Sequence, residues 1–203
     1  MKRDMTRIEM FAVMALLVVV GVAARVFPHI PNFAPVTATA LFCGAYMQKR
    51  YSLAAPIVIM LLSDYLLLYF KPLGVLHLNQ VYLPWDLWHN TLPYVYASFA
   101  ISALLGWYLK GHRSLLPITA VAIAGSAQFF LLTNAGVWLA GSYARGPDGL
   151  WQSYVAGLPF LRGTLLGDLA FTAAFFGIYE AVLGLRGLGH LRFRRAGYPA
   201  TTD

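Results

Sequence analysis

The sequence predicts an all-α integral membrane protein in which six transmembrane helices form one bundle. Of its 203 residues, 59% are apolar and 11% are charged, whereas a soluble domain carries about 25% charged residues. The mean hydropathy is +0.63, and several apolar stretches approach the roughly 20 residues that a helix needs to cross a bilayer. These features exclude a secreted disulfide scaffold, a disordered tail and a nucleic-acid-binding domain.

Hydropathy divides the chain into six apolar segments. They are residues 8–27, 34–47, 51–70, 92–109, 115–140 and 163–185. The second segment is short, because about 14 residues at about 1.5 Å each reach only about 21 Å, against a hydrocarbon core of about 30 Å. We expect this segment to be tilted, half-exposed or partly re-entrant, and still to cross the membrane.

The basic residues favour six crossings with both termini in the cytoplasm. In that arrangement eleven lie in cytoplasmic segments, namely Lys2, Arg3, Arg7, Lys49, Arg50, Lys110, Arg113, Arg186, Arg192, Arg194 and Arg195. Four lie outside, namely Arg25, Lys71, Arg145 and Arg162. This asymmetry obeys the positive-inside rule, whereas omitting the second span would place Lys49 and Arg50 outside. The sequence therefore predicts a multi-pass protein of the inner (cytoplasmic) membrane.

The absence of repeats, low-complexity tracts and linkers predicts a single transmembrane domain over residues 1–203. Residues 186–203 form a basic cytoplasmic tail, which we expect to lie loosely against anionic lipid headgroups. The single cysteine, Cys43, excludes an intrachain disulfide and any multi-cysteine metal site. Its apolar surroundings in the sequence indicate a small buried thiol.

The predicted outer connections are much longer than the cytoplasmic turns. Residues 28–35, 71–91 and 141–162 are rich in proline, glycine and aromatic residues, whereas the turns at 48–50 and 110–114 are short. Long ordered loops often carry function. Their aromatic residues fit either an interfacial belt or a lid that stacks on a ligand. The first loop has three prolines within eight residues, so it is a stiff connector that could present Asn32 and Phe33 at a fixed height.

Three polar residues interrupt apolar spans at one depth. Asp64, Asn134 and Asp168 each lie about six residues, or about 9 Å, from the predicted outer end of a span. A charge at membrane depth costs several kcal/mol unless it faces protein, water or a partner. The aspartates could instead only fix the bundle, by bonding neighbouring helices or pairing with Arg25 or Arg162.

We therefore expect a solute site beneath the outer loops. Asn32, Asp64, Asn134 and Asp168 would supply polar contacts to the solute. Trp138 and Tyr154 would supply aromatic surface, and Arg162 could pair with Asp168 or with an anionic ligand. No catalytic residue, metal ligand or cofactor is assigned.

Enzyme signatures are not met. An intramembrane aspartyl-type hydrolase would use two aspartates, but Leu165 occupies the first glycine position of its Gly-x-Gly-Asp signature and Ser63 precedes Asp64 where that class has tyrosine. The Gly-x-Ser-Gly serine of rhomboid-type proteases is missing, because Ala127 follows Ser126. The sequence thus predicts a binding or transport protein rather than an enzyme. A structural or assembly role remains the alternative, followed by the hydrolase.

Several segments resemble an uncharacterised family of bacterial six-helix membrane proteins. They are residues 32–46, 63–64, 129–138 and 154–168, and the likeness extends from Arg25 to about Glu180. That family in turn resembles the substrate-binding S components of energy-coupling-factor (ECF) vitamin transporters in length, helix count and long outer loops. The resemblance implies an S-component-like bundle that captures a vitamin-like solute at the outer face and delivers it inward by toppling.

The same resemblance implies partners. These are the lipid bilayer, a small-molecule substrate and an ECF ATPase module, with no nucleic acid. The first helix lacks the Ala-x-x-x-Ala pattern that many S components use for docking, because Leu16 follows Ala12 at that spacing. Solitary S-component-like proteins that take up vitamin B12 also exist, and some coordinate cobalt from the loop after the third helix. His77 and His89 are the imidazoles that this loop offers, which makes cobalamin one candidate substrate.

Overall fold

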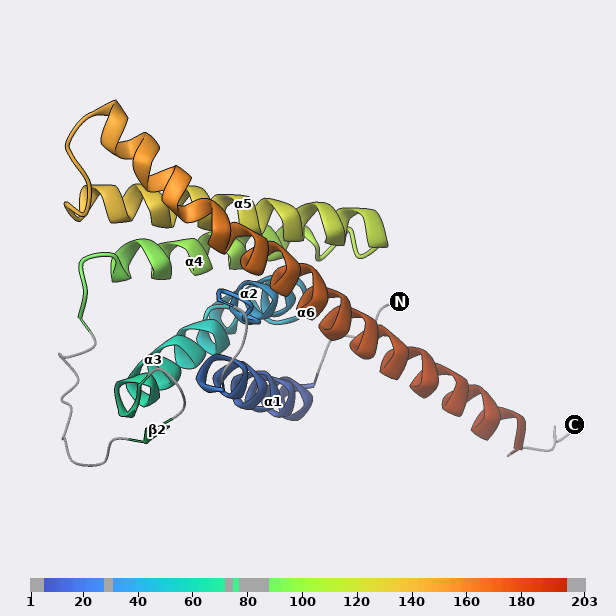
Figure 1. Cartoon of the computed structure of the whole chain (residues 1–203). Coiled ribbons are helices and arrows are strands. Elements are labelled where there is room, and N and C mark those ends of the chain that lie inside the picture. Colours follow the sequence, from blue (N-terminus) through green and yellow to red (C-terminus); the bar gives the residue numbers. More distant parts are fainter. Residues whose placement is uncertain (1–5, 28–30, 72–74, 77–87, 197–203) are drawn as a thin grey trace, which may run out of the picture.

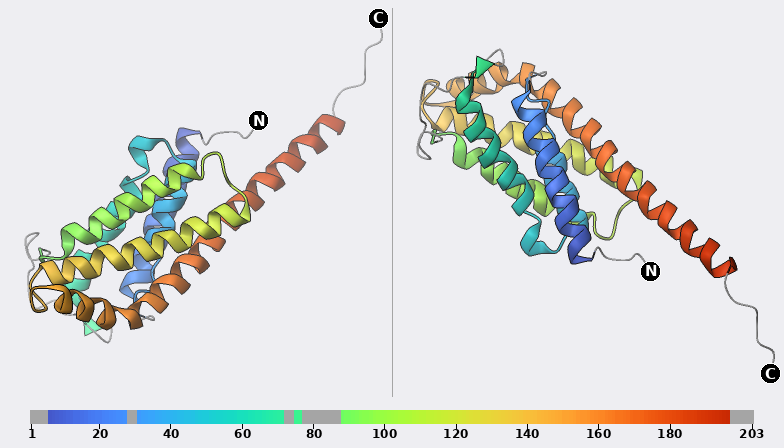
Figure 2. Two further views of the ribbon diagram at one scale, coloured as in Figure 1. Left: turned by 90° about the horizontal axis from the view of Figure 1, so that it is seen from above. Right: turned by 90° about the horizontal axis from the view of Figure 1, so that it is seen from below.

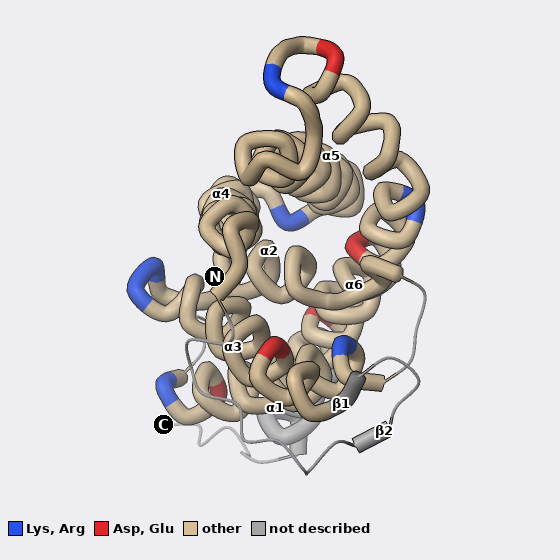
Figure 3. The backbone as a smooth tube through the Cα atoms, turned by 60° about the vertical axis from the view of Figure 1, so that its left-hand side comes forward, with Lys and Arg blue, Asp and Glu red and all other residues tan. Residues whose placement is uncertain are grey.

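The computed structural model describes residues 6–27, 31–71, 75–76 and 88–196, and within them helices form the whole framework (Figure 1). The elements are α1 (Arg7–Val26), α2 (Val36–Tyr46), the 3₁₀ turn η1 (Lys49–Tyr51), α3 (Ala54–Tyr69), β1 (Phe70–Lys71), β2 (Val75–Leu76), α4 (Leu92–Tyr108), α5 (Leu115–Leu139) and α6 (Pro147–Ala196). The two short strands form one antiparallel pair. Figure 3 shows how few charged positions the bundle carries.

Local sequence signals explain where several helices begin. At α1 the Thr6 hydroxyl accepts from the Glu9 backbone N–H at 3.2 Å, and the Glu9 carboxylate accepts from the Thr6 N–H at 3.0 Å. This reciprocal capping box satisfies two backbone donors that a helix start leaves open. Pro93 stands in the first turn of α4, where its missing N–H removes no helical hydrogen bond.

The short helix α2 lies at the centre of the bundle, and all of its residues are buried. It packs on α3, α4, α5 and α6 (Figures 1 and 2). Its contact with α4 is backbone to backbone, because a Cβ added to Gly44 would lie 2.4 Å from the Ala103 carbonyl oxygen. A Cβ added to Gly106 would lie equally close to the Leu41 carbonyl oxygen. Small residues thus let α2 and α4 approach closely.

The end of the bundle that contains the α4–α5 turn is sealed by aromatic and basic side chains. Phe42 and Tyr46 of α2 pack on Phe176 and Tyr179 of α6, with ring centroids 4.5–5.5 Å apart. Tyr46 donates to Glu180 at 2.6 Å. Lys110 and Arg113 each donate to a carbonyl near the C-terminus of α2, at Met47 and Ala45 respectively and at 2.8 Å. Cations at this position complement the helix dipole.

In the described part of the chain, four stretches are long and apolar enough to cross a membrane. They are Arg7–Val26, Lys49–Tyr69, Leu115–Leu139 and Pro147–Gly184. The α2 helix, with 11 residues, is shorter than a span, as its predicted segment indicated. The helical positions agree with the predicted segments to within a few residues, except in α6. The all-helical class is confirmed, and the six-span arrangement stays a prediction.

The predicted outer loop over residues 141–162 is wrong. The turn between α5 and α6 ends at Gly146, and α6 already begins at Pro147, so Trp151 and Tyr154 lie on the helix. Positive φ angles of 88° at Gly141 and 105° at Gly146 make the short turn, a conformation that glycine adopts without strain. The backbone also stays helical to Ala196, beyond the start of the predicted tail (Figure 1).

Candidate functional site

Two neighbouring cavities lie near the α5–α6 turn. The large chamber, of about 260 Å³, lies between α5 and α6, and its polar lining comes from Asn32, Thr133, Asn134, Ser153 and Thr164. Its aromatic lining comes from both helices and from the turn that joins them. This part of α6 is the stretch predicted as loop, so the helix itself forms one wall of the chamber.

The small chamber, of about 90 Å³, lies deeper in the bundle. Arg25, Thr37 and Asp168 line it together with apolar residues from α2, α3 and α4. Asn32, Phe129 and Thr164 line both chambers. Because the two volumes share these three lining residues, we treat the chambers as two compartments of one candidate site.

Asp168 is the most deeply buried ionisable group of the site, with 2% of its surface exposed. Ser126 of α5 donates to its Oδ2 atom at 2.7 Å, and the Thr37 side chain of α2 also hydrogen-bonds to it. In the described part of the chain no lysine, arginine or histidine pairs with this carboxylate. Asp168 is thus held by hydroxyl groups from two helices, at the wall of the small chamber.

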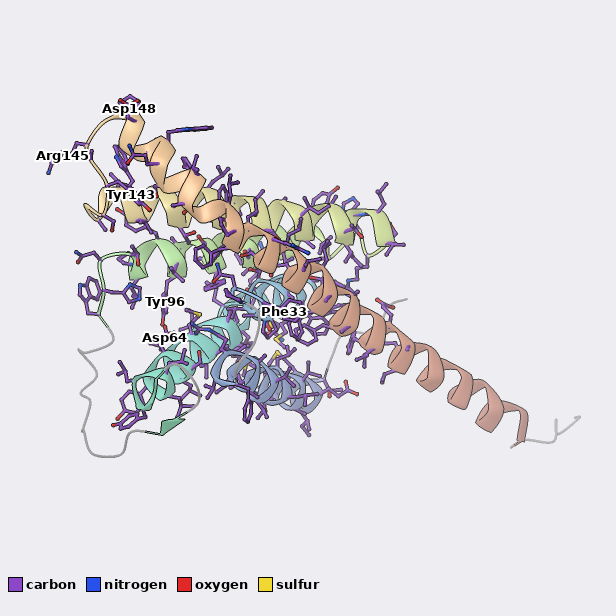
Figure 4. All side chains as sticks on the ribbon, in the orientation of Figure 1. Phe33, Asp64, Tyr96, Tyr143, Arg145 and Asp148 are labelled. Carbon is purple, nitrogen blue, oxygen red and sulfur yellow. The ribbon has the colours of Figure 1, made fainter. Side chains whose placement is uncertain are left out.

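Asp64 lies beside the small chamber rather than in its lining. Arg25 of α1 reaches the Asp64 carboxylate of α3 at 2.7 Å, and both side chains are about one-fifth exposed, at 18% and 19%. Arg25 also donates to Ser63. Tyr96 extends from α4 toward this pair (Figure 4), and its buried hydroxyl has no hydrogen-bond partner among the residues that the structure describes. The structural alternative considered from the sequence, an Arg25–Asp64 pair, is therefore observed.

Glycines on α6 allow other parts of the chain to approach the helix closely. A Cβ on Gly157 would lie 2.2 Å from the Asn134 side-chain oxygen, and one on Gly163 would lie 1.9 Å from the Pro31 carbonyl oxygen. The two glycines of the Gly163-x-x-x-Gly167 motif thus contact the segment around Phe33 rather than another helix. Asn32, at the tip of this segment, has a φ of 60°, which asparagine tolerates better than most residues.

Three other predicted site residues, Trp138, Tyr154 and Arg162, are not part of the lining of either chamber. Trp138 donates to the Ala144 carbonyl at 3.1 Å and so holds the α5–α6 turn. Tyr154 donates to the Leu131 carbonyl at 3.1 Å and packs on Phe130. Arg162 is exposed, and Asp168 bonds to hydroxyls in place of the predicted Arg162 pair. His77 lies outside the described residues.

Sequence reasoning missed several residues that line the site or hold Asp168. Thr37, Ser126 and Thr164 bring hydroxyls from α2, α5 and α6, and all three are buried. A signal was present for Thr164, because it stands one helical turn before Asp168 and so faces the same side of α6. The partners of Thr37 and Ser126 depend on how three helices cross, which spacing along the chain does not specify.

The site offers binding groups rather than a recognisable reaction centre. The described residues contain no group of three or more His, Cys, Asp or Glu side chains that could hold a metal ion. Asp64 and Asp168 have separate partners, whereas an aspartyl dyad requires two carboxylates that share a proton. The arrangement combines a polar cavity, aromatic walls and a buried carboxylate.

Fold and site together define an all-helical protein with apolar helices suited to a membrane and a polar cavity between them. The chain belongs to a family of unknown function, DUF6580, whose model matches residues 6–187. No curated protein and no solved structure matches the chain.

Proposed function

We propose that this protein binds a small solute in the two chambers and carries it across the inner membrane. The observation that supports the proposal is the convergence of polar groups from α1, α2, α5, α6 and the 31–35 segment on two cavities with shared lining residues. Polar side chains within apolar helices are costly, so their gathering around a cavity favours a binding role over simple helix packing. The large chamber alone approaches the about 300 Å³ at which small-molecule sites begin.

The distribution of charge supports an inward direction of transport. Lys49, Lys110 and Arg113 lie at the end of the bundle opposite the α5–α6 turn, and the positive-inside rule places that end in the cytoplasm. The chambers then lie toward the outer face, where a solute from outside would enter. The aromatic cluster around Phe42 and Phe176 would close the path toward the cytoplasm.

The finer part of the proposal rests on the resemblance to S components. It comprises a vitamin-like solute, with cobalamin as one candidate, and coupling to an ECF ATPase module or solitary action. The 260 Å³ chamber is too small to enclose a whole corrin, which favours a smaller vitamin-like solute or an end group of a larger one. Neither enzyme chemistry nor a resident cofactor is part of the proposal.

The test is to identify what co-purifies with the protein. The chain is purified in mild detergent, and its small-molecule extract is analysed by mass spectrometry, with absorbance recorded for a corrin. We expect one species to be enriched with the unsubstituted protein and with Asp148→Asn, which alters an exposed carboxylate outside the chambers. Asn134→Leu and Asp168→Asn should lose it while still inserting and eluting as folded protein. Retention of the species by both chamber variants would contradict binding in the chambers.

A further inference from the structure

The small chamber is lined by one carboxyl group, that of Asp168, for which the described residues supply no basic partner. Arg25 and Asp168 both line it, but Arg25 is neutralised by Asp64 at 2.7 Å and is also engaged by Ser63. Asp168 meets no cation among the described residues. When ionised, Asp168 therefore gives the chamber a negative charge that Arg25 does not balance.

The hydrogen bonds of Asp168 support its carboxylate without cancelling the charge. Ser126 donates its proton to Oδ2 at 2.7 Å, and Thr37 also bonds to the carboxylate. Hydroxyl donors stabilise an ionised carboxylate, yet a charge buried to 2% exposure within apolar helices still calls for an opposite charge nearby. The chamber wall is where a cationic group could reach it.

The rest of the lining suits an organic cation. Phe99 and Phe129 both line the chamber, with ring centroids 5.4 Å apart, and Val36, Met60 and Val95 add apolar surface. Aromatic rings attract ammonium groups, whereas hard metal cations need about six oxygen ligands. Side-chain oxygens come from four lining residues, Asn32, Thr37, Thr164 and Asp168, and most of the other lining is apolar, so the walls favour an ammonium group over a bare metal ion.

We propose that the small chamber binds the protonated amine of an organic solute, with Asp168 as its counter-ion. The inference rests on the proposed solute binding and specifies the chemical class of the solute. A cavity of about 150 Å³ holds one benzene molecule, so the 90 Å³ chamber admits only a head group. The body of the solute then lies in the large chamber, past the boundary formed by Asn32, Phe129 and Thr164.

The test compares two probes of nearly equal shape on the full chain in detergent. Benzylamine is protonated at pH 7, whereas benzyl alcohol is neutral. Their dissociation constants are measured by isothermal titration calorimetry. We expect benzylammonium to bind at least about tenfold more tightly, as a charge-assisted hydrogen bond predicts. Because this comparison uses the unsubstituted protein, it remains valid even if a variant fails to fold.

Variants then test which residue causes the preference for the charged probe. Asp168→Asn should remove the preference for the charged probe, so that the two dissociation constants become similar. Asp148→Asn, which neutralises an exposed carboxylate in the first turn of the same helix (Figure 4), should keep the preference. A preference that survives Asp168→Asn would overturn the assignment of Asp168 as counter-ion.

Other outcomes separate this inference from the proposed function. Equal affinity for the two probes would overturn the amine assignment and leave solute binding standing. Binding of neither probe would overturn the amine assignment, while the co-purification experiment judges solute binding independently. A titration with sodium chloride tests whether the chamber binds an inorganic cation instead. Stabilisation by sodium that Asp168→Asn abolishes, without a preference between the organic probes, would assign the chamber to a metal cation instead.

Discussion

Substituting Gly44 with alanine should move α2 and α4 apart, because their backbones are in close contact at this residue. The added Cβ would lie 2.4 Å from the Ala103 carbonyl oxygen and 2.8 Å from the Gly106 Cα atom. Both atoms belong to the α4 backbone, so no side chain can rotate away. An ordinary contact of about 3.4 Å requires the helix axes to move apart by about 1 Å.

The expected cost follows from this displacement. Overpacking a well-packed core costs about 1–3 kcal/mol, and the higher half of this range applies because α2 also contacts α3, α5 and α6. A small gain in helix propensity, about 1 kcal/mol for glycine to alanine, opposes it. We expect a net loss of about 1–2 kcal/mol in the free energy of unfolding.

The assay is reversible unfolding in mixed micelles with rising dodecyl sulfate, followed by circular dichroism. Gly177→Ala is the matched control, since a Cβ there meets no atom within 4 Å and the residue is also helical. It should be neutral or slightly stabilising. If Gly44→Ala and Gly177→Ala unfold at the same dodecyl sulfate fraction, the close α2–α4 contact is not as described.

Three further substitutions test other contacts. Asp64→Asn leaves the Arg25 guanidinium without its carboxylate partner. It should lower the free energy of unfolding by about 1–3 kcal/mol in the same assay. Equal stability of the variant would contradict a structural ion pair. Gly163→Leu should displace the segment at Pro31, from whose carbonyl its Cβ would lie 1.9 Å, and so abolish solute co-purification while circular dichroism stays unchanged. Thr6→Ala removes the cap of α1 and should cost about 1 kcal/mol, seen as faster hydrogen exchange at Glu9 and Met10; unchanged exchange would contradict the capping box.

Much of the fold was predictable because apolar runs and the signals for helix ends depend on short stretches of sequence. The spans at 92–109 and 115–140 match α4 and α5 closely, since prolines and glycines bound long apolar runs. The start of α6 was missed because Pro159 and two glycines, Gly149 and Gly157, give residues 147–162 a composition that resembles a loop. These glycines serve a different purpose, since Gly157 receives the Asn134 side chain against the helix. Composition alone does not distinguish these two uses of glycine.

The candidate site was predictable only in part. Polar residues in apolar spans identified Asn134 and Asp168, which line the chambers, and Asp64, which lies beside them. Equal depth along separate helices indicated one level of the bundle, but it did not indicate which faces meet. The Arg25–Asp64 pair and the hydroxyl partners of Asp168 depend on helix rotation and crossing. Those are properties of the packed bundle rather than of any single segment.

The complete burial of α2 has a consequence for biogenesis. Its 11 residues extend about 16 Å, and its closest partner, α4, begins 46 residues after α2 ends, at Leu92. While the nascent chain emerges from the ribosome, α2 therefore lacks the neighbour against which Gly44 packs. Stable integration of this segment has to await synthesis of α4, so assembly is expected to proceed by late insertion rather than one helix at a time.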